Sequence, residues 1–309
     1  MNLTISEYLE GIAEKVVPKN SIDLLNAETT TYIPTNISQL CSPAIIWDWK
    51  VNPIGQISYH QFQLSDTAPL SSKSEVLFIS SGTSISEAFR TFLNILKANK
   101  DFPLKAELEK LIAKNTPPEA YDDGWTKVLM NGNLEWKPDW IFSESVYSWK
   151  QKVAAGTIHN SGTIKVKLHK EDNLSSIFML DDDATKSSEF ISQFETVEVY
   201  ADAWGLIFIR PGSWFSSSIL KLGAPYMPKG IKLLTSRVAS FYIADNPVFT
   251  FKSNKKINMN SINTAAAFQC FGIDTVLNMQ PEDLENSNQI TLHSKTVDPA
   301  IVGVVIEQL

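Results

Sequence analysis

The run ETVEVYADAWGLIFIR, residues 195–210, constrains the fold more than any other stretch, because its side chains alternate between apolar and polar. In an extended strand, one face would carry Val197, Val199, Ala201, Ala203, Ile207 and Ile209. The opposite face would carry Glu198, Tyr200, Asp202 and Trp204. A period of two is typical of a strand with one buried face. It favours antiparallel strands over a doubly wound parallel sheet, whose strands are buried on both faces.

Other strand-like runs surround this one in the second half of the sequence. They cover residues 163–169, 175–180, 232–244, 248–253 and 300–307, and turn residues separate most of them. Earlier in the chain, residues 44–51 and 57–64 are joined by a segment containing Asn52, Pro53 and Gly55. That pair predicts a hairpin with a turn of several residues.

Helical periodicity dominates the middle of the chain. Apolar residues recur at helical spacing over residues 85–96, and again over 104–112 after the Phe102-Pro103 break. A third helix is expected from Asp139 to Gly156. The N-terminus predicts a short amphipathic helix, with Leu3, Tyr8, Leu9 and Ile12 roughly on one side.

These patterns predict an α+β protein. We expect a mixed N-terminal part with a helical middle, residues 1–156 with three helices, followed by a β-rich and mostly antiparallel half, residues 157–309. The 309 residues, of which 43% are hydrophobic, suffice for one large domain or two ordinary ones. The two parts could therefore also share one core.

Charge and hydropathy limit the classes of partner. Acidic residues outnumber basic ones by 34 to 27, and no basic run is longer than Lys255-Lys256, so we expect no nucleic acid partner. No window approaches the roughly 20 apolar residues of a membrane-spanning helix. The N-terminus lacks the basic region of a signal peptide. We expect a protein that is cytoplasmic at synthesis, with signal-peptide-independent export left open.

Sparse cysteine usage fits a reducing compartment. Cys41 and Cys270 share no metal-binding spacing and are expected to be free thiols in the core. The four histidines, His60, His159, His169 and His293, also lack the spacing of metal ligands. The sequence alone therefore predicts no metal site.

The segment SSGTSISE, residues 80–87, is rich in hydroxyl groups at an expected strand–helix joint. A phosphate loop needs several glycines, and a nucleophile elbow needs a serine flanked by glycines, but only Gly82 is present. Ser84 and Glu87 instead have the spacing of a capping box, in which the serine side chain binds the amide of the glutamate. We interpret the segment as a helix start.

The segment SSIFMLDDDAT, residues 175–185, has the D-x-D-x-T spacing at the end of an apolar run. It resembles the first motif of haloacid-dehalogenase-type phosphotransferases. The resemblance implies that Asp181 is the nucleophile, that Asp183 is the acid/base, and that Mg²⁺ neutralises the phosphoryl oxygens. It also implies a hydroxyl from Thr235 or Ser236, a lysine at Lys255 and a metal ligand at Asp274. It requires residues 175–180 to form a central strand of a parallel sheet. The alternative is a solvated acidic turn at a strand end.

Eight tryptophans are many for this length. Core packing explains most of them, but Trp204 lies on the polar face of its run beside Tyr200 and Arg210, and Trp214 follows closely. An exposed aromatic cluster there would mark a binding or assembly surface. These four residues are the candidate binding residues of the sequence.

We therefore expect a non-enzymatic, β-rich binding or assembly module without a cofactor. It would act as a component, cargo or toxin-like effector of a larger bacterial machine. Its partner would be a protein, or a small-molecule or glycan ligand, bound through an aromatic surface. The alternative function is the Mg²⁺-dependent phosphohydrolase centred on Asp181 and Asp183.

Overall fold

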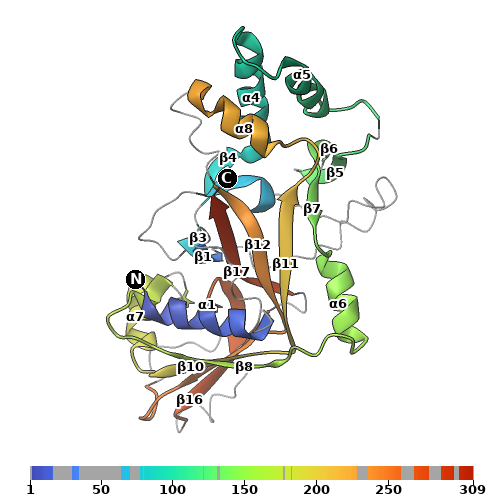
Figure 1. Ribbon diagram of the computed structural model, residues 1–309. Coiled ribbons are helices and arrows are strands. Elements are labelled where there is room, and N and C mark those ends of the chain that lie inside the picture. Colours follow the sequence, from blue (N-terminus) through green and yellow to red (C-terminus); the bar gives the residue numbers. More distant parts are fainter. Residues whose placement is uncertain are drawn as a thin grey trace.

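The computed structural model describes residues 2–16, 30–34, 64–69, 77–78, 80–120, 122–130, 133–176, 178–181, 183–227, 236–258, 268–277, 287–295 and 299–308. The α-helices are α1 (Leu3–Val16), α4 (Ile85–Ala98), α5 (Lys105–Lys114), α6 (Val146–Ala154), α7 (Ala184–Ile191) and α8 (Ser217–Gly223). Within the described ranges, 3₁₀ turns cover Leu174–Ser176 and Ala224–Tyr226. Figure 1 shows α4, α5 and α8 gathered at one end of the molecule.

Six strands form a central sheet in the order β3-β1-β17-β12-β11-β7. Their bounds are β1 (Thr30–Pro34), β3 (Leu77–Phe78), β7 (Trp140–Phe142), β11 (Ala203–Pro211), β12 (Ser236–Asp245) and β17 (Ala300–Gln308). Only the β1–β3 pair in this sheet is parallel. The short β7 pairs with the end of β11, where Ile141 lies opposite Arg210.

Seven strands form a second, fully antiparallel sheet in the order β8-β10-β13-β16-β15-β14-β9. Their bounds are β8 (Gly162–Lys167), β9 (Phe178–Leu180), β10 (Thr196–Ala201), β13 (Val248–Lys252), β14 (Phe268–Cys270), β15 (Ile273–Leu277) and β16 (Gln289–Ser294). Two small hairpins complete the strands: β2 (Thr67–Pro69) pairs with β4 (Ser80–Ser84), and β5 (Trp125–Met130) pairs with β6 (Asn133–Pro138).

One hydrophobic core lies between the two sheets and encloses α1. The buried face of α1 supplies Ile5, Tyr8, Leu9 and Ile12, and the seven-stranded sheet supplies Val197, Val199, Phe249, Phe251, Ile290 and Leu292. The central sheet contributes Trp204, Tyr242, Ala244, Ala300 and Val302 from one face. In Figure 1, α1 runs across the gap between the two sheets.

A second core covers the other face of the central sheet. The sheet contributes Ala203, Ile207, Ile209, Phe241, Ile243, Ile301 and Val304, and helices α4, α5, α6 and α8 pack against them. Gly205 faces this core, where an added Cβ would lie 2.6 Å from the indole nitrogen of Trp149. The central sheet thus contributes residues to a core on each face, while Phe208 and Arg210 of β11 are exposed. Both cores contain residues from either side of residue 156.

The α+β class and the β-rich, mostly antiparallel second half are confirmed. The helices expected near residues 3–12, 85–96 and 104–112 are present as α1, α4 and α5. The helix expected from Asp139 is wrong in its first part, because Trp140–Phe142 form the edge strand β7 and α6 begins only at Val146. Most of the hairpin expected over 44–64 lies outside the described residues.

The expectation of one long strand over 195–210 is also wrong. The run divides at the exposed Asp202 into β10 and β11, which belong to different sheets. The apolar positions up to Ala201 therefore enter the first core, while Ala203, Ile207 and Ile209 enter the second. A period of two continues through both strands, so alternation alone does not mark the change of sheet.

Candidate binding surfaces

The two tryptophans predicted to form an exposed surface are both fully buried. Trp204 lies in the core beside α1, and its Nε1 donates to the carbonyl oxygen of Gly162 at 3.0 Å. Trp214 lies in the second core, and its Nε1 donates to the carbonyl oxygen of Asp139 at 2.6 Å. The expectation that Trp204 is exposed was wrong because this face of β11 is covered around Trp204 by α1 and the other sheet.

Tyr200 and Arg210, the other two candidates, are exposed but lie on different sheets. Tyr200 belongs to β10 of the seven-stranded sheet. Arg210 lies on β11 opposite Ile141, and Phe208 points to the same side with 57% of its surface exposed. The structure therefore divides the predicted aromatic surface into two separate exposed patches.

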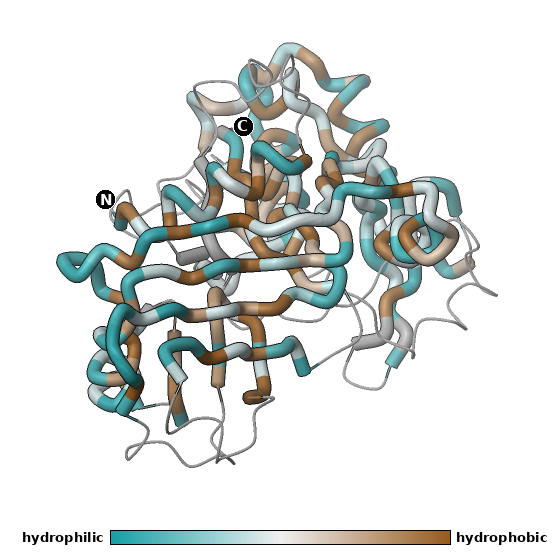
Figure 2. Tube along the Cα trace, turned by 90° about the horizontal axis from the view of Figure 1, so that it is seen from below, coloured by the Kyte–Doolittle hydropathy of each residue, from teal (hydrophilic) through white to brown (hydrophobic). Residues whose placement is uncertain are grey.

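The patch around Tyr200 runs across the outer face of the seven-stranded sheet. Tyr200 lies opposite Val248, Val248 lies opposite His293, and His293 lies opposite Val276 on the next strand. Tyr200 is 40% exposed and Val276 is 41% exposed, with the two half-buried residues between them. We call these four residues the outer row. In Figure 2, hydrophilic and hydrophobic residues alternate along the strands of this sheet.

Polar groups border the outer row. On the neighbouring row, Glu198 forms an ion pair with Lys252 at 2.7 Å. At one end, Asp202 accepts a hydrogen bond from Asn246 Nδ2 at 2.8 Å. Desolvation and a hydrogen bond with Asp202 raise the pKa of the Tyr200 phenol. The outer row thus combines an apolar strip with a polar rim, an arrangement common in protein interfaces.

The acidic motif stands at the edge of the same sheet. Strand β9 is the last strand in the order and pairs antiparallel with β14, whereas the phosphotransferase family requires a central parallel strand. Asp183 is the N-cap of α7 and accepts from the amides of Thr185 and Lys186, both at 3.0 Å. These bonds, chiefly that from Lys186, lower its pKa. Asp181 is exposed, with a φ of 51°.

The remaining residues implied by the resemblance come from separate elements. Ser236 is buried at the start of β12, Lys255 is exposed after β13, and Asp274 on β15 accepts from Gln269 Nε2 at 3.3 Å. Thr235 lies outside the described residues. Among the residues that the structure describes, no three His, Cys, Asp or Glu side chains gather into a group that could hold a metal.

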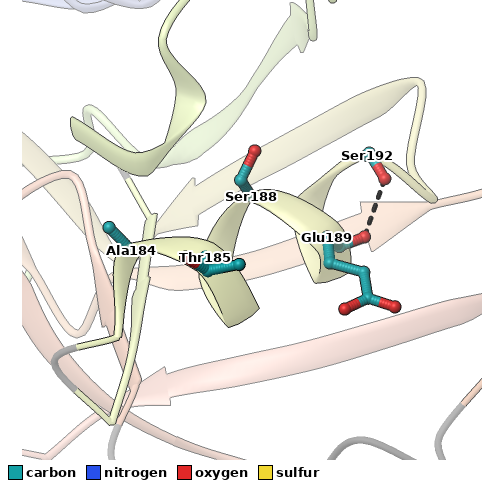
Figure 3. A pocket seen from close by; sticks show the side chains of 5 residues that line it. All are labelled: Ala184, Thr185, Ser188, Glu189 and Ser192. Carbon is teal, nitrogen blue, oxygen red and sulfur yellow. Dashed lines mark hydrogen bonds between the residues drawn. The ribbon is translucent and has the colours of Figure 1, made fainter.

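Depressions on the described surface include two that lie away from the outer row. One, of about 560 Å³, is lined by Ala184, Thr185, Ser188, Glu189 and Ser192 of α7 and its C-terminal turn. Figure 3 shows these short side chains along one side of the helix, with Ser192 Oγ bonded to the carbonyl oxygen of Glu189. It is open and has no converging charged groups. The other lies between α4 and α5 and is lined by Arg90, Leu93, Asn94, Ile112, Asn115, Thr116 and Pro117.

The hydroxyl-rich segment of residues 80–87 contains the start of helix α4, as predicted. Ser84 is the N-cap of α4, and its Oγ accepts from the amide of Glu87 at 3.1 Å. Sequence reasoning missed the buried carboxylate beside it. Asp66 accepts from the hydroxyl groups of Ser84 and Ser86 and from the Ser86 amide. Burial raises the pKa of Asp66 to about 6, although these three hydrogen bonds oppose the rise.

Cysteine and histidine show no catalytic pairing in the described part of the chain. Cys270 is a buried free thiol, and burial raises its pKa to about 12. His169 Nε2 lies 3.0 Å from Glu7 Oε1 and thereby links β8 to α1. His293 belongs to the outer row, and His159 is exposed. Cys41 and His60 lie outside the described residues.

No family model and no curated protein sequence matches this chain. Within the described ranges, no helix has both the length and the apolar character needed to cross a membrane.

Proposed function

We propose that this chain is a non-enzymatic binding or assembly module that docks a protein partner on the outer row. The observation that carries the proposal is the exposure of Tyr200 and Val276 at the two ends of a continuous strip across the sheet. Tyrosine is enriched at protein interfaces because one ring combines a large apolar area with a hydrogen-bonding hydroxyl.

The shape of the surface favours a protein over a small molecule or a glycan. Small ligands bind in concave sites that bury most of their surface. The outer row lies on the face of a sheet, and none of its residues lines the α7 depression or the pocket between α4 and α5. An extended face of this kind fits the surface of another folded protein. The role that we propose for such a module is a component, cargo or effector of a larger bacterial assembly.

Site-specific photo-crosslinking in cells tests this proposal. A benzophenone amino acid would replace Tyr200 or Val276 in the outer row, Phe208 in the second patch, or Leu222 on α8, which is 47% exposed. We expect the same protein to be captured from positions 200 and 276, and not from 208 or 222. Val276→Glu should abolish capture from position 200 because it places a charge within the strip.

Two outcomes would contradict the proposal. Capture of the same protein from position 222 would show that crosslinking reflects the abundance of that protein in the cell and not a specific contact with the outer row. Capture from Phe208 alone would move the interface to the central sheet. Circular dichroism of Val276→Glu checks that any loss of crosslinking is not caused by unfolding. The substitution is made at Val276 and not at the neighbouring Thr275, because Thr275 is buried.

The alternative, a Mg²⁺-dependent phosphohydrolase, is supported by the D-x-D-x-T spacing of Asp181, Asp183 and Thr185. The edge position of β9 and the capping role of Asp183 speak against it. A phosphatase assay with Mg²⁺ should give the same background rate for the wild type and for Asp181→Asn. A rate in the wild type that Asp181→Asn removes, with folding preserved, would establish the enzyme instead.

A further inference from the structure

The outer row and Thr163 together extend two strands to either side of β13, on the face of the sheet that Figure 2 shows. Val248 lies on β13 itself, with Tyr200 on the neighbouring β10 and His293 on the neighbouring β16. Thr163 on β8 lies opposite Tyr200, and Val276 on β15 lies opposite His293. The face is therefore matched about β13, because each neighbouring strand carries a ring and each strand beyond it carries a β-branched side chain.

A second row, of polar residues, runs beside the outer row. Asp202 follows β10, and its carboxylate accepts from Nδ2 of Asn246 at 2.8 Å. Lys295 follows β16, and its amide donates to the carbonyl oxygen of Asp274 on β15 at 2.9 Å. Asp202 and Lys295 are both exposed, and each follows a residue of the outer row by two positions, which places it on the same face. This row thus carries a carboxylate on one side of β13 and an ammonium group on the other.

A twofold axis parallel to β13 would bring two such faces together. The axis exchanges the strands on either side of β13 and keeps each row opposite the same row of a second copy. Tyr200 then contacts His293 of the second copy, and Val276 contacts its Thr163, while Val248 contacts its own counterpart. Aligned sheets pack face to face with their strand directions within about 30° of each other, and a twofold contact uses the same patch on both copies.

The same axis places opposite charges together. Asp202 faces Lys295 of the second copy, and the symmetry repeats this pair. On the other side of the outer row, Glu198 faces the uncharged Thr291. Lys252 faces its own counterpart further out, but each is neutralised by the ion pair with Glu198 at 2.7 Å. An axis along the outer row would instead set Glu198 against Asp202, so charge complementarity favours the axis along β13.

We propose that the outer row is the interface of a homodimer, in which the docked partner is a second copy of this chain. This inference rests on the proposed docking function and names its occupant. The dimer buries the exposed rings and methyl groups of the outer row, and the two Asp202–Lys295 pairs at its rim set the register between the copies.

Sedimentation velocity of the purified full chain tests the dimer. We expect the average mass to rise toward twice the monomer mass between micromolar and near-millimolar concentrations. Val276→Glu should weaken association because it buries a charge in the interface, whereas Leu222→Glu, at an exposed position of α8, should not. A wild type that stays monomeric throughout, or a dimer that Val276→Glu leaves unchanged, would overturn the proposal.

Charge reversal tests the register. Asp202→Lys and Lys295→Glu should each weaken association by about tenfold or more, because like charges then face each other twice. An equimolar mixture of the two variants should associate as tightly as the wild type, since every contact between them joins opposite charges. Asp101→Lys and Lys221→Glu, at exposed positions away from this sheet, should each behave as the wild type.

A mixture that stays monomeric, with both variants folded by circular dichroism, would overturn the proposed interface. Should either variant not fold, the wild type and Val276→Glu decide. Photo-crosslinking separates this inference from the proposed function: capture of a second copy from positions 200 and 276 supports both. Capture of a different protein there, with a monomeric purified chain, would overturn the homodimer and leave the docking surface in place. A monomeric chain without any capture would contradict both.

Discussion

Asp66 carries a carboxylate into the interior beside the start of α4 and binds two serine hydroxyls and one amide there. Burial favours the neutral acid, and this cost outweighs the three hydrogen bonds that favour the charged form. The ionised group is therefore a source of local instability at neutral pH. Its raised pKa gives the protein a pH dependence that can be measured.

Asp66→Asn should remove that dependence at this site, because an amide does not titrate. The pKa of Asp66 rises from 3.8 to about 6 on folding, so its stabilising contribution is complete below the lower value and is lost as pH rises through the upper one. Lowering the pH from 7 to 4.5 should therefore stabilise the wild type by about 2 kcal/mol relative to Asp66→Asn. Urea unfolding at both pH values measures the difference.

The matched control for this experiment is Asp101→Asn, at an exposed carboxylate after α4. The difference in free energy of unfolding between Asp101→Asn and the wild type should be the same at the two pH values. A wild type that loses stability relative to Asp66→Asn on acidification would contradict the assignment of a raised pKa.

The hydroxyl-rich joint shows what the sequence reveals of single residues. The spacing of Ser84 and Glu87 predicted the cap correctly, because a helix cap is a local interaction. No sequence pattern pointed to Asp66, since its partners Ser84 and Ser86 are distant in the sequence and only the β2–β4 pairing brings them together. The burial of Trp204 was likewise invisible, because it depends on α1 at the other end of the chain.

At the scale of single elements, the start of α4 couples a cap to the buried carboxylate. Ser84→Ala removes the bond to the Glu87 amide and also a donor to Asp66. Loss of a cap costs about 1 kcal/mol, and we expect a larger loss here at pH 7 because the charged Asp66 loses a partner. Denaturant unfolding of Ser84→Ala measures it.

Ser216→Ala serves as the comparison, since Ser216 caps α8 by accepting from the Ile219 amide at 3.3 Å without a carboxylate. In the Asp66→Asn background, the cost of Ser84→Ala should approach that of Ser216→Ala. If Ser84→Ala costs no more than Ser216→Ala in the wild type, the coupling to Asp66 is absent.

Helix α1 depends on a cap supplied from far along the chain. The Asp172 carboxylate accepts from the amides of Leu3 at 3.2 Å and Thr4 at 2.8 Å. A carboxylate at this end also interacts favourably with the helix dipole. Asp172→Ala should therefore loosen α1 and raise amide hydrogen exchange over residues 5–12, with Asp172→Asn intermediate. Glu10→Ala, at an exposed position of the same helix, should leave exchange unchanged.

A result in which Asp172→Ala leaves α1 as protected as in the wild type would mean that burial of Ile5, Tyr8 and Ile12 holds the helix without the cap. The amphipathic pattern predicted that α1 exists. It contained no information on Asp172, because a cap across 168 residues has no local pattern.

For the whole molecule, we expect the two cores to unfold as one cooperative unit, because both contain residues of the central sheet. Residues of β17 enter both cores: Val302 enters the core around α1 and Val304 the core under the helices. Val302→Ala and Val304→Ala should each lower stability by roughly 1–3 kcal/mol. Methyl resonances of Leu180 in one core and Leu96 in the other should lose intensity at the same urea concentration in both variants. Separate midpoints would show two independent folding units.

The sequence predicted the class of fold and most strands of the second half, because alternation is local, but it did not predict α7, α8 or β14 to β16. It did not predict how the strands divide between two sheets, since Asp202 interrupts the run without breaking its period. Of the candidate binding residues, Tyr200 and Arg210 are exposed, and the outer row joins Tyr200 to strands far away in sequence. Which residues lie side by side in the outer row is set by the register between the strands, and the sequence pattern does not show that register.

The place of β17 in the central sheet has a consequence for synthesis. β17 pairs with β1 on one side and β12 on the other, and it follows both in the sequence, so it leaves the ribosome after them. At about 5–20 residues per second, both neighbours are synthesised before their shared partner, with unpaired edges and apolar faces open. We therefore expect the nascent chain to be prone to aggregation until β17 has been synthesised.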